Sequence, residues 1–251
     1  MKVYVILPAR YGSTRFEGKP LALILGKPMI QHAYERARAA EGVDRVVVAT
    51  DDRRIFDTVA GFGGEAVMTS PDHPSGTDRL AEAVDLLGAD DQDIVINVQG
   101  DQPAFDPRQV SEVIKPLLDD PALDMSTPII PTVDPLEIGN PNHVKVVFDH
   151  DQMALYFSRA PIPWPREGDQ SYYFKHIGIY GYRAGFLRRF VKLPQGRLEQ
   201  IERLEQLRAL EHGHRIKVVI TQMDSPEVDR PADLAKVEAL LRRLEPGREK
   251  P

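Results

Sequence analysis

Short apolar runs alternate with amphipathic segments along the first hundred residues. The runs at residues 3–7, 45–50 and 93–99 are rich in β-forming side chains, which is typical of buried strands, and residues 65–68 form a further short strand. Between these runs, apolar residues recur at the three- and four-residue spacing of helices. A succession of strand, helix and strand favours parallel pairing through right-handed crossovers, so the pattern predicts an α/β fold with a mostly parallel sheet.

The pattern changes after about residue 125, where strands follow one another more closely. Residues 145–159 predict a hairpin that turns at 149–151, and residues 174–182 predict one strand with His176, Gly178 and Tyr180 on one face. A helix at 198–212 is expected to bury a stripe of Ile201, Leu204 and Leu207. The other elements expected here are strands at 125–131 and 216–221, a loop at 135–141, and helices that begin near Asp106-Pro107, at Phe186 and at Pro231.

The loop after the first strand is the first candidate for ligand binding. Pro8 ends the strand because it cannot donate to a sheet, and the following loop carries two glycines with Arg10, Arg15 and Lys19. Ligands of α/β sheets bind at the carboxyl ends of strands, and cations with free backbone N–H groups suit a polyphosphate. The alternative is that Arg10 and Lys19 are solvated surface charges. A Walker A loop fits poorly, because Pro20 stands where a Ser or Thr would hold magnesium.

Asp101 is a candidate magnesium ligand. It follows a buried strand in a glycine-containing turn, and Mg²⁺ prefers such hard oxygen ligands. The alternative is a loop aspartate that caps the next helix. Asp229 lies just before the last helix, where the helix dipole favours a carboxylate.

Composition narrows the possible functions. The formal net charge of −6 over 251 residues argues against general nucleic-acid binding, and the absence of cysteine excludes disulfides and thiolate chemistry. No apolar run approaches the roughly 20 residues of a membrane span, and the chain enters a strand without a signal peptide. We therefore expect a cytoplasmic protein.

Several motifs in order resemble one enzyme family. They are the loop P-A-R-Y-G-S-T-R-F-E-G-K-P at 8–20, S-G-T-D-R-L at 75–80, N-V-Q-G-D-Q-P at 97–103, Y-F-S-R-A-P-I-P-W at 156–164 and H-I-G-I-Y-G-Y at 176–182. Together they resemble the cytidylyltransferases that activate the acid sugar 3-deoxy-manno-octulosonate (Kdo) with CTP. The chain departs from the family pattern at Phe16-Glu17, at Gln102, where Glu is usual, and at Arg230, where Thr is usual.

The resemblance implies a fold and a reaction. The fold is a Rossmann-like sheet of the nucleotide-diphospho-sugar transferase type, with one domain over 1–245, an antiparallel insertion at about 125–195 and a frayed tail at 246–251. The insertion would form the sugar site and the contact of a homodimer. The reaction transfers CMP from CTP to the anomeric hydroxyl of Kdo with Mg²⁺, for lipopolysaccharide biosynthesis.

The resemblance also assigns roles to residues. Catalytic roles fall to Arg10, Lys19, Asp101 and Asp229, of which the two aspartates would hold Mg²⁺. The residues implied for CTP are Pro8, Ala9, Arg10, Ser13, Lys19, Ser75, Gly76, Thr77, Arg79, Gln99 and Gly100. Those implied for Kdo are Gln99, Arg159, His176, Tyr180, Glu202, Glu205 and Gln206.

Purely structural roles remain as alternatives for several of these residues. Thr77 would cap a helix, Arg159 would form a surface ion pair, His176 would be a hydrogen-bonded core residue, and the 202–206 group would be a solvated face. Rival functions are a cytidylyltransferase for sialic acid or amino-Kdo, a sugar-1-phosphate nucleotidyltransferase, and a noncatalytic nucleotide-binding protein on the same fold.

Overall fold

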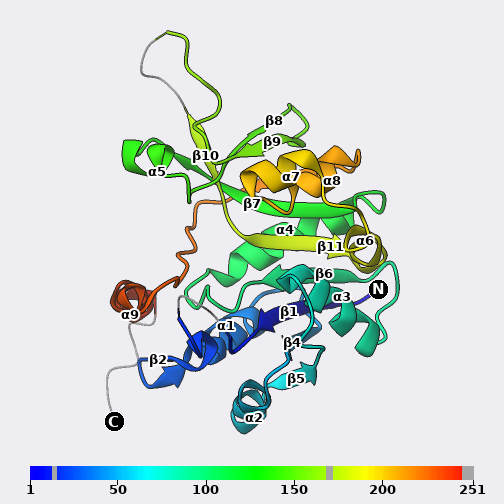
Figure 1. The fold of residues 1–251 in the computed structure, drawn as a ribbon, viewed down its shortest axis with the longest axis vertical. Coiled ribbons are helices and arrows are strands. Elements are labelled where there is room, and N and C mark those ends of the chain that lie inside the picture. Colours follow the sequence, from blue (N-terminus) through cyan, green and yellow to red (C-terminus); the bar gives the residue numbers. More distant parts are fainter. Residues whose placement is uncertain (13–15, 168–171, 245–251) are drawn as a thin grey trace.

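A ten-stranded sheet runs through the whole molecule (Figure 1). The structure is a computed structural model, and it describes residues 1–12, 16–167 and 172–244. Along the sheet the order is β5-β4-β1-β6-β11-β7-β10-β8-β9, with β12 paired to β7. No helix of the described residues is long and apolar enough to cross a membrane.

The first half of the sheet is parallel, as the alternating pattern predicts. Strand β1 (Val3–Ala9) pairs in parallel with β4 (Arg45–Thr50) and β6 (Ile94–Val98), and β4 pairs with β5 (Glu65–Met68). The helices between these strands are α1 (Met29–Arg38), α2 (Arg53–Gly61) and α3 (Gly76–Leu86). Short elements precede α1, namely the 3-10 helix η1 (Lys19–Leu21) and the strands β2 (Leu23–Ile24) and β3 (Lys27–Pro28).

The second half is largely antiparallel, which confirms the expected change of pattern. Strand β11 (Ile179–Arg183) pairs antiparallel with both β6 and β7 (Met125–Thr132) and so joins the halves. The predicted hairpin is formed by β8 (Lys145–Phe148) and β9 (Ala154–Ser158). The remaining strands are β10 (Tyr173–His176), antiparallel to β7 and β8, and β12 (Ile216–Ile220), parallel to β7.

Helices cover both faces of the parallel half. Side chains of β1 alternate, so Tyr4 and Ile6 join one buried cluster while Val5 and Leu7 join another. The first cluster includes residues of α3 and of α6 (Ala184–Phe190), and the second includes residues of α1 and of α4 (Pro107–Asp119). Burial on both faces explains why these strands are continuous apolar runs rather than alternating ones.

Three local predictions are corrected. The strand expected at 174–182 is interrupted at residues 177–178, between β10 and β11. The loop expected at 135–141 contains a short helix, α5 (Pro135–Gly139), because the Asp134 side chain caps its first turn. The helix expected at 198–212 is two helices, α7 (Arg197–Glu202) and α8 (Leu207–Glu211).

The break between α7 and α8 follows from one backbone conformation. Arg203 is left-handed, with φ of 53°, and it ends α7. The change of direction leaves Ile201 67% exposed, which corrects its predicted burial, whereas Leu204 and Leu207 are buried as expected.

The C-terminal segment returns to the N-terminal half. After β12 the chain passes through an extended segment to the 3-10 helix η2 (Pro231–Asp233) and to α9 (Leu234–Leu244), which lies beside the β2 region in Figure 1. Val228, Val237 and Leu241 share a buried cluster with Ile24 and Met29. Residues from the two ends of the chain thereby meet at the loop after β1. The tail expected to fray lies outside the described residues.

Candidate active site

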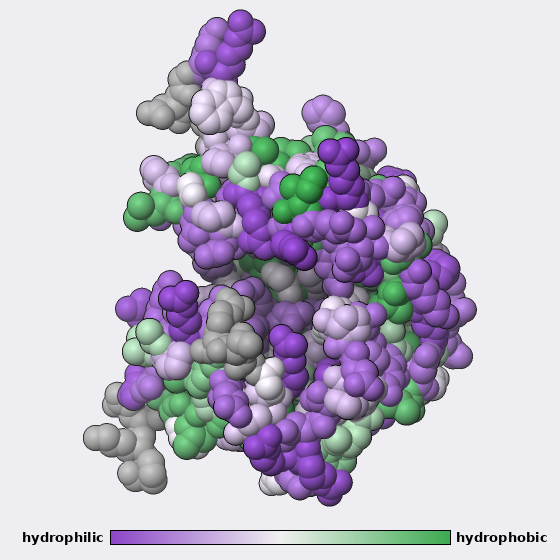
Figure 2. All heavy atoms as spheres, in the orientation of Figure 1, coloured by the Kyte–Doolittle hydropathy of each residue, from purple (hydrophilic) through white to green (hydrophobic). Residues whose placement is uncertain are grey.

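A cavity of about 230 Å³ opens at the carboxyl ends of β1 and β6. Figure 2 shows the surface hollowed between the two halves, with mostly hydrophilic residues around the opening. Of the residues implied for CTP, nine line the cavity: Pro8, Ala9, Arg10, Lys19, Ser75, Gly76, Arg79, Gln99 and Gly100. Ser13 lies outside the described residues. The structure therefore brings together residues that are separated by up to about ninety positions in the sequence.

Gly100 allows β1 and β6 to approach closely at this cavity. A Cβ at this position would lie 3.2 Å from the Pro8 carbonyl oxygen and 3.3 Å from Ile30 Cδ1. A larger residue would therefore require the Pro8 carbonyl or the Ile30 side chain to shift by a few tenths of an ångström.

The amino end of α3 forms one wall. The helix is capped by Ser75, whose Oγ accepts from the amides of Thr77 and Asp78 at 3.1 and 3.2 Å. This corrects the interpretation in which Thr77 is the cap. The Thr77 side chain is buried and donates to Glu205, so it faces the segment between α7 and α8 and does not line the cavity assigned to CTP.

Arg79 is a buried cation in the same wall. Its Nη2 lies 3.1 Å from Asp51 Oδ2 and its Nη1 lies 2.5 Å from Thr69 Oγ1. The guanidinium is thus held by Asp51 and Thr69, and Arg79 lines the same cavity as Arg10 and Lys19.

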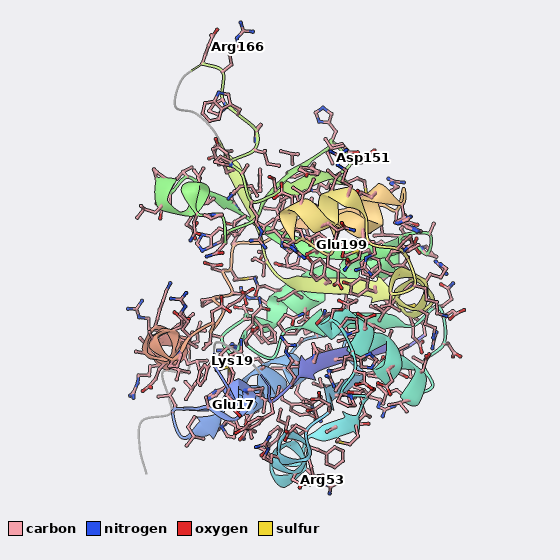
Figure 3. The ribbon with its side chains drawn as sticks, in the orientation of Figure 1. Glu17, Lys19, Arg53, Asp151, Arg166 and Glu199 are labelled. Carbon is pink, nitrogen blue, oxygen red and sulfur yellow. The ribbon has the colours of Figure 1, made fainter. Side chains whose placement is uncertain are left out.

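Lys19 links the first loop to Asp101 and to the segment that carries Asp229. Its Nζ donates to Asp101 Oδ2 at 2.5 Å and to the Val228 carbonyl oxygen at 3.0 Å, and the Val228 amide donates to the Asp101 carbonyl at 2.9 Å. Figure 3 places Lys19 near the meeting point of α9 and the N-terminal half. Asp229 is the next residue after Val228, so the two aspartates lie on segments that touch.

A second cavity, of about 530 Å³, adjoins this point. Its wall includes Asp229 and Glu227 from the C-terminal segment and His176 with Gly178 from the break between β10 and β11. Asp101 lines the first cavity and Asp229 the second. The contact between Lys19 and Val228 therefore links a residue of the first cavity to the chain segment that lines the second.

Glu227 is a site residue that the sequence analysis missed. Its side chain lines the second cavity, and the residue is exposed to solvent there. Desolvation, followed by the charges of Asp101 and Asp229, raises the pKa of the Glu227 carboxyl to about 7. The available signal was an acidic residue two positions before Asp229.

His176 and Tyr180 lie side by side, as predicted, with ring centroids 5.2 Å apart. The imidazole Nε2 lies 2.9 Å from Thr127 Oγ1, and the ring packs edge-on against Phe157. Desolvation by the surrounding protein lowers the pKa of His176 to about 3, so the ring is neutral near pH 7.

The side chains of Glu202 and Arg159 each form a hydrogen bond with the backbone of the other residue. Glu202 accepts from the Ser158 hydroxyl at 2.6 Å and from the Arg159 amide at 3.0 Å. The Arg159 guanidinium donates to the carbonyl oxygens of Glu202, Pro141 and Arg203 at 2.6, 2.9 and 3.2 Å. Arg159 therefore ties the β9 end to α7, and neither residue lines one of the two cavities.

Gln206 is buried and Glu205 is half-buried and hydrogen-bonded, so this pair does not form a solvated face. Glu205 accepts from the hydroxyls of Ser75, at 3.0 Å, and Thr77, and desolvation raises the pKa of its carboxyl. Gln206 is 4% exposed. Glu205 thus connects the segment between α7 and α8 to the capped end of α3.

Comparisons with known proteins agree with this geometry. A model of the family described as "Cytidylyltransferase" matches residues 4–216. The chain is 58% identical to a 3-deoxy-manno-octulosonate cytidylyltransferase of Desulfatibacillum aliphaticivorans, over 96% of this chain and 99% of the relative. It is 55% identical to an 8-amino-3,8-dideoxy-manno-octulosonate cytidylyltransferase of Shewanella frigidimarina, over 96% and 99% of the two chains.

Solved structures place the fold. A CMP:2-keto-3-deoxy-manno-octonic acid synthetase complexed with CTP superposes with a TM-score of 0.92 at 47% identity, over 97% of this chain and 100% of the other. A 4-diphosphocytidyl-2C-methyl-D-erythritol synthase shares the fold alone, at a TM-score of 0.65 and 15% identity, over 96% and 98% of the two chains. The predicted nucleotide-diphospho-sugar transferase fold is confirmed, and the chain belongs to the cytidylyltransferase family.

Proposed function

We propose that this enzyme transfers CMP from CTP to the anomeric hydroxyl of Kdo and releases pyrophosphate, to supply CMP-Kdo for lipopolysaccharide biosynthesis. The observation that carries the proposal is the contact of Lys19 with both Asp101 and the segment of Asp229, between two cavities. This arrangement suits a reaction in which a nucleotide bound in one cavity reacts with an acceptor bound in the other. The relatives named for this sugar support the choice of acceptor.

The first cavity suits CTP. Arg10, Lys19 and Arg79 supply three positive charges on its wall, which fits a triphosphate and the charge that grows on a departing pyrophosphate. Ser75 and Gly76 stand at the amino end of α3, where backbone N–H groups are available to a polar base or phosphate.

Asp101 and Asp229 fit a magnesium site. Within the described residues no group of three or more acidic, histidine or cysteine side chains forms a closed metal cage. Two carboxylates beside a phosphate cavity are what Mg²⁺ uses, because it keeps several waters and takes the remaining ligands from phosphate. When bound, the ion would polarise the reacting oxygens and neutralise charge on the triphosphate.

The second cavity suits the sugar. His176 is a neutral hydrogen-bonding group at its wall, and Gly178 leaves space beside it. An in-line attack on the α-phosphate requires the anomeric hydroxyl to lie between the two cavities, close to Asp101 and Asp229. Positioning and charge then supply most of the rate.

The test is pyrophosphate release from CTP and Mg²⁺, with and without Kdo. We expect release only with Kdo, and release with neither Kdo nor a related acid sugar would reject the proposal in favour of a noncatalytic nucleotide-binding protein. Asp101→Ala is expected to keep its circular dichroism spectrum and to lose product at every Mg²⁺ concentration. The matched control is Asp119→Ala, an exposed carboxylate of α4 paired with Lys115. Retained activity in Asp101→Ala would reject the role of this carboxylate.

We also infer a cytoplasmic homodimer, in which the insertion at about 125–195 of a single domain over 1–245 contacts a second copy. Trp164, Leu136 and Tyr172 lie in or near this insertion's protruding edge and are 82%, 83% and 70% exposed. Large apolar side chains that are so exposed are typical of interaction surfaces. Light scattering gives the mass in solution, and a monomer at all concentrations would reject this assembly.

A further inference from the structure

Tyr11 connects the start of the loop after β1 to the end of that loop. Its carbonyl oxygen accepts from the Gly18 amide at 3.0 Å, directly before Lys19. Its ring also packs against Gly18, because a Cβ built on that glycine would lie 3.1 Å from the Cε2, Cζ and Oη atoms of Tyr11. A displacement of the Tyr11 ring would therefore displace Gly18 and, through the chain, Lys19.

The Arg54 side chain of α2 lies over the Tyr11 ring. Its Cζ is 3.3 Å from the ring centroid, well inside the distance at which a guanidinium is attracted to the face of an aromatic ring. Asp52 holds the guanidinium, because its carboxylate accepts from Nε at 3.0 Å and from Nη2 at 2.7 Å. The same carboxylate accepts from the Arg54 amide at 2.9 Å as the cap of α2. The Tyr11 ring is thus held by a cation that is itself fixed to the start of a helix.

Arg54 also offsets a charge at the place where the loop departs from the family pattern. Glu17 is exposed and puts a negative charge one residue before Gly18. Hydrogen bonding to Asp52 raises the pKa of the Arg54 guanidinium, and the charges of Asp52, Tyr11 and Glu17 raise it further. The cation therefore attracts two residues of this loop, Tyr11 through its ring and Glu17 through its carboxylate.

We propose that Arg54 is a positioning residue of the CTP site, which holds Tyr11 and thereby keeps the loop after β1 in the conformation that binds the triphosphate. The proposal rests on the function proposed above. Arg10 and Lys19 line the first cavity, and each is bonded in the chain to a residue of the Tyr11 and Gly18 contact. Neither Arg54 nor Tyr11 is among the described residues that line the two cavities. Arg54 therefore acts through the Tyr11 ring and not by touching the nucleotide.

The experiment compares Arg54→Met with Arg53→Met by the initial rate of pyrophosphate release. The Arg54 side chain is 59% exposed, so both variants are expected to fold, which circular dichroism checks. Arg53 is the matched control, because it precedes Arg54 on the same helix and lies over Phe56, a ring of α2, at 4.9 Å. Figure 3 shows Arg53 on α2, apart from Lys19.

We expect Arg54→Met to raise the KM for CTP about threefold, the usual size of an exposed cation–π contact, and to leave the KM for Kdo unchanged. Arg53→Met removes the same charge and should leave both KM values unchanged. An unchanged KM for CTP in Arg54→Met, or an equal rise in Arg53→Met, overturns the proposal. A purely structural role of Arg54 would instead change the KM values for both substrates, and that result also overturns it.

A double variant tests whether Arg54 acts through the ring. Tyr11→Leu removes the aromatic face, so adding Arg54→Met to it should raise the KM for CTP no further. A further rise as large as the one in the wild-type background would show that Arg54 acts by its charge alone, and it would overturn the proposal.

Calorimetric titration with CTP and Mg²⁺, without Kdo, separates this proposal from the proposed function. A wild-type protein that binds CTP but releases no pyrophosphate with Kdo rejects the proposed function. The positioning role is then decided by the Kd for CTP, which should be about threefold higher in Arg54→Met than in the wild type. Equal Kd values overturn the positioning role.

Discussion

The neutral imidazole of His176 makes the stability of the fold depend on pH. Its folded pKa is about 3, whereas a histidine in an unfolded chain has a pKa of about 6.5. Below pH 6.5 the imidazole of His176 is protonated in the unfolded chain but stays neutral in the folded protein. The contribution of this group to the free energy of unfolding is therefore fully present above pH 6.5 and is lost as the pH falls toward 3. Between pH 7 and pH 5 the loss from this one group is about 2 kcal/mol.

The assay is urea unfolding followed by circular dichroism at pH 7, 6 and 5, in the wild type and in His176→Gln. Glutamine keeps a partner for the Thr127 hydroxyl, which lies 2.9 Å from the imidazole, but does not titrate. Other groups contribute equally to both proteins, so the difference between their slopes isolates His176. We expect the wild type to lose about 2 kcal/mol more than the variant over this range.

Equal slopes in the two proteins would refute the reasoning. They would mean that the ring accepts a proton in the folded state, and therefore that water or a neighbouring acid solvates it. His176→Gln is expected to be less stable than the wild type at pH 7, because it loses the ring contacts with Phe157 and Tyr180. The comparison depends only on the change with pH, so this constant offset does not affect it.

Two further predictions follow from buried acids. Glu205→Ala removes the acceptor for Ser75 and Thr77, so we expect a higher KM for CTP and a loss of roughly 1–3 kcal/mol in unfolding free energy. An unchanged KM would contradict the link between Glu205 and the nucleotide wall. Arg208→Met leaves the buried Glu199 carboxylate unpaired and should cost about 3–5 kcal/mol in a urea melt, whereas Arg53→Met, at an exposed pair, should cost less than about 1 kcal/mol.

The parallel half of the fold could be predicted from the sequence because its signals are local. A strand buried on both faces must be apolar at nearly every position, and the runs around Val5, Val47 and Ile96 meet that condition. The signal for the start of α4 is also local, because Asp106 and Gln109 form a capping box around Pro107. In each case the residues that decide the structure are neighbours in the chain.

The interruptions of the second half could not be predicted in the same way. The helical pattern at 198–212 continues through Arg203, and only the packing of α7 and α8 against other parts of the molecule shows where the chain must turn. The break between β10 and β11 has the same character, because the sequence around Gly178 alternates as one strand would. Tertiary contacts overrode local preference at both places.

The sequence by itself determined which residues have the chemistry for a nucleotide and a metal, because charge and hydrogen-bonding capacity belong to the side chain. It did not determine which of them face a cavity. Thr77 donates to Glu205, and the Arg159 guanidinium donates to backbone carbonyl oxygens. Glu227 accepts from Gln102. Those outcomes depend on contacts between residues that are 18 to about 130 positions apart, and only the folded chain brings such residues within hydrogen-bonding distance.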